Sequence, residues 1–386
     1  MTSAGISSTP DVVVIGGGLI GTAISWRLRQ AGLDVVMIVG ERSAAASGVA
    51  AGMLAPITET TFTEQRLLEL NIASLRRYPD FVDELEAASG LPAGLRRTPS
   101  LSIAYDGDDA ARLTTFADFL ARAGHAGKQL TSRECRGYEP LLAPSVRAGL
   151  LVEGDWSCDN RLLWRSLMEA AQRIGVRELA GFVHRVTSSH GRVTGVQLAD
   201  GSSIDARWVV VANGAWARQV DGLPYLPVRP VKGQILRLDP GRLPAPSLTI
   251  RAYVRGTEIY LVPREGGREV VLGATVEELG FDHRVTAGAI YELLRDGRTV
   301  MPMSAEYALA ETSVGWRPGT PDNAPILGGC DLDGLVVATG HYRNGVLLTP
   351  ITADVISTLI ISGELDGVAA PFTIYRFALT TGRHAR

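Results

Sequence analysis

The sequence has few cysteines and no long uncharged apolar run. Its three cysteines, Cys135, Cys158 and Cys330, are scattered and form no CxxC pair, which argues against a disulfide framework and favours a reducing compartment. The most hydrophobic late segment, residues 351–361, is short and contains an aspartate, so it predicts a buried helix and not a membrane span. Residues 1–10 lack the charged and apolar regions of a signal peptide and predict a flexible start. We therefore predict a cytoplasmic protein with no membrane partner.

An excess of charge of either sign is also lacking. The chain of 386 residues has 38 Lys and Arg against 41 Asp and Glu, so no basic field indicates a nucleic-acid partner. The histidines show no metal-ligand spacing, and we expect no metal. With 46% hydrophobic residues, the chain is long enough for one large core or two domains.

What the sequence does contain is a glycine-rich turn near its start. Four apolar, mostly β-branched residues precede Gly16, Gly18 and Gly21, which have G-x-G-x-x-G spacing, and a helical pattern follows. Gly16 permits a tight turn, Gly18 lets the backbone approach a pyrophosphate, and Gly21 lets the helix pack closely on the strand. This context predicts a dinucleotide site; the alternative is a glycine-rich turn without a ligand.

The end of the second predicted strand departs from the dinucleotide pattern. A helix over 22–30 and a strand over 35–39 complete a βαβ unit, in which an acidic residue should end the second strand and bind the ribose hydroxyls. Here Gly40 follows the strand, and the first acid is Glu41. Either Glu41 reaches back to the ribose, which we favour, or backbone groups hold it and Glu41 is a solvated turn residue.

The remaining pattern predicts an α/β protein. Helical periodicity covers 62–90 and 159–174, and an almost wholly apolar run over 208–212 indicates a central parallel strand. Residues 224–275 alternate with a period of two, which indicates a mostly antiparallel sheet. Strands of the parallel type occur at both ends of the chain, so we predict a discontinuous Rossmann-like domain with an inserted β-rich domain.

Three further segments carry a family resemblance. They are Ser47–Pro56 (SGVAAGMLAP), Val209–Trp216 (VVVANGAW) and Ala338–Pro350 (ATGHYRNGVLLTP), supported by residues 230–234, 260–264, 273–275 and 315–322. Together with the glycine turn, they resemble the D-amino-acid-oxidase-like family of FAD-dependent amine oxidases over about residues 11–377. The resemblance is strongest to the glycine-oxidising branch, which serves thiamine biosynthesis.

The resemblance implies a domain division. The FAD-binding domain would comprise 11–90, 151–224 and 325–377, and the substrate-binding domain 91–150 and 225–324. Residues 1–10 and 378–386 would form flexible tails.

The resemblance also implies a reaction. FAD would oxidise glycine and other small amines or amino acids to the imine, which water converts to glyoxylate and ammonia, while O2 is reduced to H2O2. The FAD would be non-covalent, because residues 313–320 lack the cysteine that attaches flavin in sarcosine oxidase relatives. The alternatives are a D-amino-acid or sarcosine-type enzyme with another substrate or electron acceptor, and a flavoprotein that only binds a partner. Oligomers are common in the family, although no sequence feature establishes one here.

Four residues are expected to line the substrate site. The resemblance assigns Arg317 to the substrate carboxylate, which its planar fork matches, and Tyr260 to a second contact with that carboxylate. Arg343 is expected near substrate or flavin, or else it pins its own loop, and Met53 either lines the pocket or only packs. Val276 stands where methionine is common, so we expect room for a larger substrate side chain.

The cofactor contacts are expected to come from the same segments. Asn344, Gly345 and Val346 precede the last predicted helix, so their backbone N–H groups suit the negative charge of reduced flavin, and His341 is expected to do no acid–base work. The complete predicted set of cofactor-binding residues is Gly16, Gly18, Ile20, Gly21, Glu41, Ser47, Ala51, Gly52, Met53, Val186, Ala212, Gly214, Trp216, Arg317, Arg343, Asn344, Gly345, Val346 and Leu347.

Overall fold

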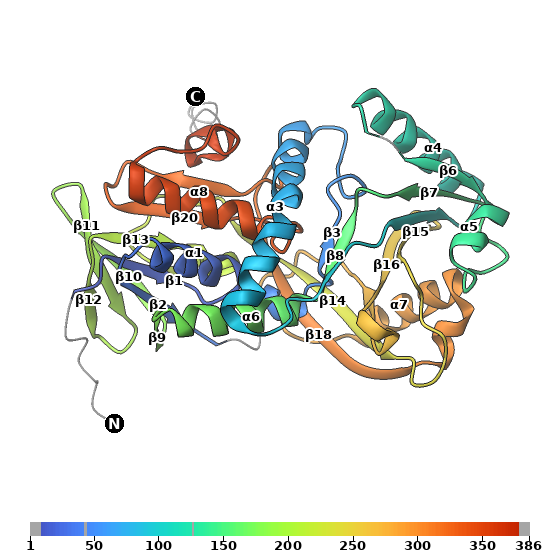
Figure 1. Ribbon diagram of the computed structural model, residues 1–386, viewed down its shortest axis with the longest axis horizontal. Helices are drawn as coiled ribbons and strands as arrows, with labels where there is room; N and C mark the ends of the chain where they lie inside the picture. Colours follow the sequence, from blue (N-terminus) through green and yellow to red (C-terminus); the bar gives the residue numbers. More distant parts are fainter. Residues whose placement is uncertain (1–8, 42–44, 126, 378–386) are drawn as a thin grey trace.

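The computed structural model describes residues 9–41, 45–125 and 127–377, so most of both predicted tails lies outside the described residues. The molecule is elongated, with a large β-sheet toward each end. Helices α3 (Gln65–Ser89) and α6 (Asn160–Arg173) lie between the two sheets (Figure 1). Both helices fall on the segments where the periodicity predicts them.

The first sheet is built from distant parts of the chain. Its order is β19–β20–β13–β1–β2–β9, and all its pairs are parallel except β19–β20. The predicted strand over 208–212 is confirmed as a central one. The strands are β1 (Val12–Ile15), β2 (Val35–Val39), β9 (Arg177–Ala180), β13 (Trp208–Val211), β19 (Ile326–Gly329) and β20 (Leu335–Thr339).

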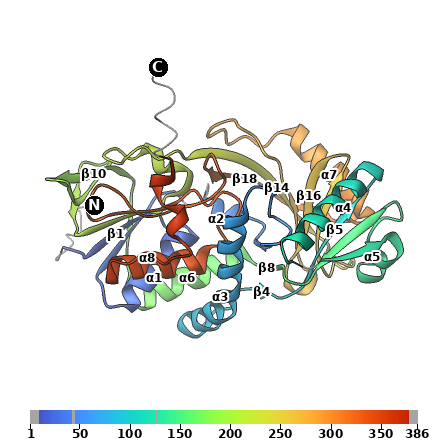
Figure 2. The ribbon, with the colours of Figure 1, turned by 90° about the horizontal axis from the view of Figure 1, so that it is seen from above.

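Both faces of this sheet are covered, as its continuous apolar strands require. Val12 and Val14 pack toward the helices, whereas Val13 and Ile15 pack on the opposite face. Helix α1 (Leu19–Gln30) lies beside α6 and α8 (Thr349–Ser362) on one face, and the small sheet of β10 covers the other (Figure 2). That small sheet consists of β10 (Val183–Ser189), β11 (Arg192–Leu198) and β12 (Ser203–Asp205).

The second sheet has the order β18–β14–β17–β16–β15–β5–β7–β6. Only the pair β15–β5 is parallel among these described strands, which confirms the predicted mostly antiparallel sheet. The strands are β5 (Ser100–Ala104), β6 (Lys128–Thr131), β7 (Ala148–Val152), β14 (Arg229–Asp239), β15 (Thr249–Val254), β16 (Thr257–Pro263), β17 (Val270–Gly273) and β18 (Ala308–Gly319).

Helices cover this sheet on both faces as well. Leu113 and Phe116 of α4 (Gly107–Arg122) pack on one face, and Leu293 of α7 (Ala287–Val300) packs on the other together with α5 (Ser132–Tyr138). Over β14, β17 and β16 the helix that packs on the sheet is the short α2 (Ala46–Val49), through Val49, and the candidate site lies beside it. The predicted α/β class is confirmed, while the domain boundaries stay a prediction.

The connections between the sheets include short elements that the sequence pattern does not reveal. They are α2 (Ala46–Val49) and a three-stranded sheet of β3 (Met53–Leu54), β8 (Trp156–Cys158) and β4 (Leu95–Arg96). Helix α1 begins at Leu19, three residues before the predicted start, because the Ser47 hydroxyl accepts a hydrogen bond from the Leu19 N–H at 2.9 Å. The segment 351–361 is confirmed as part of a buried helix, and no helix of the described residues is long and apolar enough to cross a bilayer.

Candidate active site

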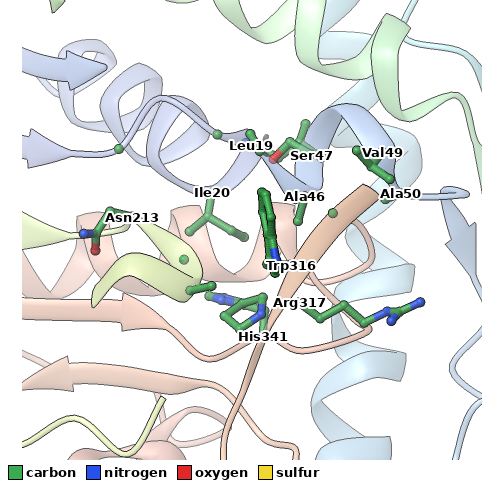
Figure 3. A pocket seen from close by; sticks show the side chains of 18 of the residues that line it. Leu19, Ile20, Ala46, Ser47, Val49, Ala50, Asn213, Trp316, Arg317 and His341 are labelled. Atoms are coloured by element: carbon green, nitrogen blue, oxygen red, sulfur yellow. Dashed lines mark hydrogen bonds between the residues drawn. The ribbon is translucent and has the colours of Figure 1, made fainter. Parts of the chain in front are cut away.

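A cavity of about 590 Å³ runs along the carboxyl ends of the first sheet and reaches the second sheet. Its wall includes residues from Ile15 to Val346, so distant segments of the chain enclose it. Figure 3 shows it between the start of α1, where Leu19 and Ile20 lie, and β18, which carries Trp316 and Arg317. The carboxyl ends of parallel strands are where open α/β sheets bind ligands.

The glycine turn has the geometry that its spacing predicts. Gly16 has φ of +116°, and a Cβ on it would lie 2.6 Å from the carbonyl oxygen of Ala212. A Cβ on Gly21 would lie 1.9 Å from the carbonyl oxygen of Gly16, so only glycine allows this helix to pack on this turn. Gly18 lines the cavity at the N-terminus of α1.

The start of α1 is suited to an anion. No acidic residue occupies its first turn, and its first N–H groups have no partners within the helix. Asn160 and Trp164 of α6 hold the surrounding loops, since Asn160 Nδ2 donates to the Ser47 carbonyl at 2.6 Å and Trp164 Nε1 donates to the Gly17 carbonyl at 2.9 Å. A pyrophosphate therefore fits here.

The second sheet forms the opposite wall through alternate residues. Strand pairing sets Val231 opposite Arg317, Gly233 opposite Gly315, and Gly273 opposite Tyr260. Because side chains alternate between faces, one row of these strands faces the cavity. The row comprises Gly233, Ile235, Arg251, Glu258, Tyr260, Gly315 and Arg317, and the neighbouring Ile259, Trp316 and Pro318 also line the cavity.

Two glycines make the floor between Arg317 and Tyr260. A Cβ on Gly233 would lie 2.4 Å from Arg317 Nη1, and a Cβ on Gly273 would lie 2.4 Å from the Tyr260 hydroxyl. The guanidinium and the phenol ring therefore lie flat over bare backbone. The arrangement brings a cationic fork and a hydroxyl to one side of the cavity.

Arg317 differs from the other two arginines of the cavity wall. Arg251 pairs with Glu59 at 2.8 Å, and Arg343 lies 3.6 Å from Glu258. Among the described residues no carboxylate pairs with Arg317, whose Nη1 donates only to the carbonyl oxygens of Thr275 at 3.1 Å and Lys232 at 3.4 Å. Burial lowers the pKa of Arg317, which is the effect of a cation kept from water without a counter-ion.

Tyr260 and His341 stay neutral at physiological pH. Burial raises the pKa of the Tyr260 phenol, so it remains a hydrogen-bond donor. Burial also lowers the pKa of His341 to about 3, and its Nε2 lies 3.0 Å from the Thr352 hydroxyl. That His341 carries no acid–base role stays a prediction.

A buried lysine supports the position of Arg317. Lys232 is fully buried, and its ammonium lies 2.7 Å from Asp282 and 3.4 Å from Glu277. Its backbone N–H and carbonyl also pair with those of Glu277 at 2.9 and 3.0 Å. The two carbonyl oxygens that accept hydrogen bonds from Arg317 belong to Lys232 and Thr275. The pairing of Lys232 with Glu277 fixes both, because Thr275 lies two residues before Glu277.

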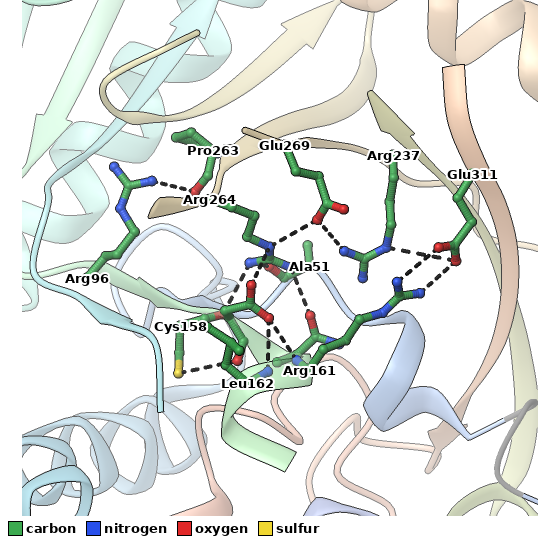
Figure 4. Close-up of polar contacts among 12 residues, drawn as sticks. Ala51, Arg96, Cys158, Arg161, Leu162, Arg237, Pro263, Arg264, Glu269 and Glu311 are labelled. Carbon is green, nitrogen blue, oxygen red and sulfur yellow. Dashed lines mark hydrogen bonds and ion pairs between the residues drawn. The ribbon is translucent and has the colours of Figure 1, made fainter. Parts of the chain in front are cut away.

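A second polar network fixes the segment that carries Met53 (Figure 4). Arg264 is 5% exposed, and its Nη1 donates to the carbonyl oxygens of Ala51 at 2.9 Å and Cys158 at 3.2 Å. Its Nη2 donates to Asn160 Oδ1 at 2.8 Å, which links β16 to α6. A further chain of ion pairs extends the network through Glu269, Arg237, Glu311 and Arg161.

The structure brings most of the predicted site residues to this one cavity. All four residues predicted for the substrate site, Arg317, Tyr260, Arg343 and Met53, line it, and Val276 does so too. Of the predicted cofactor-binding residues, those lining it are Gly16, Gly18, Ile20, Glu41, Ser47, Ala51, Gly52, Met53, Ala212, Gly214, Trp216, Arg317, Arg343, Gly345 and Val346.

Four predicted residues do not line the cavity. Gly21 packs behind the turn, and Val186 is buried between the first sheet and the small sheet of β10. Leu347 points into the core, and Asn344 faces a neighbouring cavity that also meets Arg343. For these four the predicted contact with the cofactor stays a prediction without support from the shape of the site.

Sequence reasoning missed several parts of the wall. Arg251 and Glu59 carry no motif, and only strand register shows that Arg251 lies opposite Tyr260. The sequence pattern gives no signal for Phe182, because this residue lies in a short turn after β9. Trp316 adjoins the predicted Arg317 and could have been found from it.

FAD fits the cavity by several independent observations. The glycine turn and the start of α1 suit a pyrophosphate. Two buried polar atoms of the wall residues, Asn213 Oδ1 and Trp316 Nε1, have no hydrogen-bond partner among the described residues. No cysteine of the described residues lines the cavity. No group of three His, Cys, Asp or Glu residues in the described part could hold a metal ion.

Comparison with known proteins agrees with this site. Residues 11–359 match the family described as FAD dependent oxidoreductase, and the chain belongs to that family. Its cofactor is accordingly FAD.

Among individual proteins, the chain is 37% identical to the bifunctional protein ThiO/ThiG of Synechocystis sp., over 97% of this chain and 55% of that protein. It therefore spans about half the length of such relatives. It is 32% identical to the glycine oxidase of Geobacillus kaustophilus, over 95% of this chain and 97% of the relative. The crystal structure of glycine oxidase from the same organism superposes with a TM-score of 0.86 at 30% identity, covering 96% of this chain and 99% of that one.

Proposed function

We propose that the chain oxidises glycine and other small amines or amino acids, using FAD, to the corresponding imine. The observation that carries this proposal is Arg317, an arginine without a carboxylate partner, beside the Tyr260 hydroxyl in a cavity suited to FAD. An unpaired, partly buried guanidinium favours a ligand that brings its own carboxylate. The similarity to glycine oxidase supports the same substrate class.

The overall reaction balances without another reactant. Glycine, O2 and water give glyoxylate, ammonia and H2O2. When bound, FAD would supply the acceptor for the hydride that leaves the substrate Cα, and O2 would take up those two electrons.

The chain's own groups bind and orient the substrate. Arg317 holds the carboxylate through two parallel N–H groups, and Tyr260 donates its hydroxyl proton to the same carboxylate. Gly233 and Gly273 let these two side chains lie against the sheet. The oxidation requires the substrate amine in its neutral form. Because burial lowers the pKa of His341, this histidine is a weak base, and we assign the removal of the amine proton to solvent.

The place of the reaction is proposed on the same basis. Similarity to a bifunctional ThiO/ThiG protein supports a role in thiamine biosynthesis, in which the imine of glycine would be the useful product. We place the enzyme in the cytoplasm and take O2 as its electron acceptor. A homo-oligomer stays a prediction.

Anaerobic mixing of the FAD-loaded protein with glycine, sarcosine and D-alanine tests the proposal. We expect bleaching of the flavin band and, after O2 is admitted, one H2O2 per flavin reduced. Arg317→Ala should lower kcat/KM by about 100-fold, since two charge-assisted hydrogen bonds are lost. Arg122→Ala, at the exposed end of α4, is the control.

The outcomes separate the alternatives. No bleaching by any of the three compounds would contradict the proposal. Bleaching followed by slow reoxidation in air would point to an electron acceptor other than O2.

A further inference from the structure

An exposed aromatic ring lines the cavity just after β9. Phe182 is 61% exposed, follows β9, and lines the cavity together with Gly40 and Glu41. Of the exposed aromatic side chains in the described part of the chain, it is the one that lines this cavity. An aromatic ring that lines a ligand cavity is available for contact with an apolar or aromatic part of the ligand.

Strand order shows which part of FAD reaches this ring. The glycine turn follows β1, so the pyrophosphate belongs there, and β2 and then β9 lie next to β1 in the sheet. The adenosine ribose of a dinucleotide lies at the carboxyl end of the second strand, here Val39 and Gly40. The base must therefore extend further, toward the end of β9, where Phe182 stands about two strand spacings, or roughly 10 Å, from β1.

The glycine at position 40 makes room for the ring. A Cβ on Gly40 would lie 2.8 Å from Phe182 Cε1 and 3.2 Å from Cδ1. An acidic side chain at position 40 would therefore require the Phe182 ring to shift from its observed place. The absence of a side chain at the end of β2 accommodates the ring where it lies.

The backbone holds the ring in this place. The Gly181 N–H donates to the Val39 carbonyl at 3.0 Å, and the Ala199 N–H donates to the Phe182 carbonyl at 2.8 Å. The turn is thus tied both to the end of β2 and to the small sheet. Phe182 is presented to the cavity from a fixed backbone.

We propose that Phe182 is a nucleobase-binding residue that stacks on the adenine of FAD. In the usual dinucleotide site, an acid at position 40 would add to FAD affinity by binding the ribose. Here the contact between Phe182 and the base supplies affinity instead. The two contacts differ in chemistry, because stacking recognises the π-face of the base and an acid recognises hydroxyl groups. The inference rests on FAD as the cofactor of the proposed function but requires no substrate.

Binding to the flavin-free protein tests the proposal. Dissociation constants would be measured for FAD, FMN and ADP by flavin fluorescence and, for ADP, by displacement of FAD. Phe182→Ala should weaken FAD and ADP about 5- to 100-fold, the range for removing one base-stacking ring, and leave FMN within about twofold. Phe182→Trp should keep FAD affinity within about threefold, because it preserves a π-face.

The controls make the result specific. Tyr225→Ala removes another exposed ring, 68% exposed and away from the cavity, and should leave all three constants unchanged. Gly40→Ala should displace the ring and reproduce the selective loss of FAD and ADP. Equal weakening of FAD and FMN, or wild-type FAD affinity in Phe182→Ala, would overturn the proposal. Neither outcome depends on whether an amino acid reduces the flavin.

Discussion

The guanidinium of Arg317 lies directly over the α-carbon of Gly233, so closely that a Cβ there would meet Nη1 at 2.4 Å. Gly233→Ala should therefore displace the guanidinium while it leaves the strand intact. We expect kcat/KM for glycine to fall about 10- to 100-fold, the effect of losing a charge-assisted hydrogen bond, with FAD affinity unchanged. Gly137→Ala, where a Cβ meets nothing within 4 Å, is the matched control. Unaltered kinetics in Gly233→Ala would show that the substrate carboxylate binds elsewhere.

Lys232 should act on the substrate through the backbone that carries Arg317. Lys232→Met removes the buried cation between Asp282 and Glu277, so we expect a lower free energy of unfolding. In the folded fraction, KM for glycine should rise more than kcat falls, because the altered groups only position the carboxylate site. Stability comes from denaturant titration and the split from steady-state kinetics, with Lys128→Met on β6 as control. A fall in kcat with KM unchanged would contradict a positioning role.

His341 should make stability, and not the chemical step, depend on pH. Its folded-state pKa is about 3 and its unfolded value about 6.5, so below pH 6.5 the unfolded chain binds the extra proton. Stability from this group is full above pH 6.5 and declines as the pH falls toward 3, by about 2 kcal/mol at pH 5. The stability difference between wild type and His341→Asn should thus shrink from pH 7.5 to pH 5. A constant difference for His341→Asn would contradict this prediction.

Val276 should set the space beside the substrate Cα. It is 51% exposed and lines both the main cavity and the neighbouring one. Val276→Met fills that space, so the ratio of kcat/KM for D-alanine to that for glycine should fall about tenfold, the effect of about one methylene group in a pocket. Leu279→Met, at another exposed apolar residue after β17, serves as control. A rise in that ratio would show that the substrate side chain points elsewhere.

Local pattern was sufficient for the nucleotide end of the site. The three glycines of the turn follow directly from steric needs that act within a few residues, and the structure shows the same close contacts. Arg317 and Tyr260 could be named only through the family motifs, since their meeting depends on strands β18 and β16 being brought together across two others.

The sequence alone does not reveal which distant strands pair with one another, or which of their side chains therefore face the cavity. Arg251 faces the cavity because β15 pairs with β16, and Phe182 does so because β9 adjoins β2. Val186 does not line the cavity, because the side chains of a strand alternate between its two faces and the side chain at position 186 faces the core. Asn344 and Leu347 do not line the cavity either. They belong to a turn whose successive side chains point in different directions, so Leu347 faces the core and Asn344 faces the neighbouring cavity.

The cavity wall draws on residues from Ile15 to Val346. A growing polypeptide therefore has no complete flavin site until Val346 has been synthesised. A chain that stops before the turn at 343–346 would lack part of the wall, and we expect it to bind FAD more weakly.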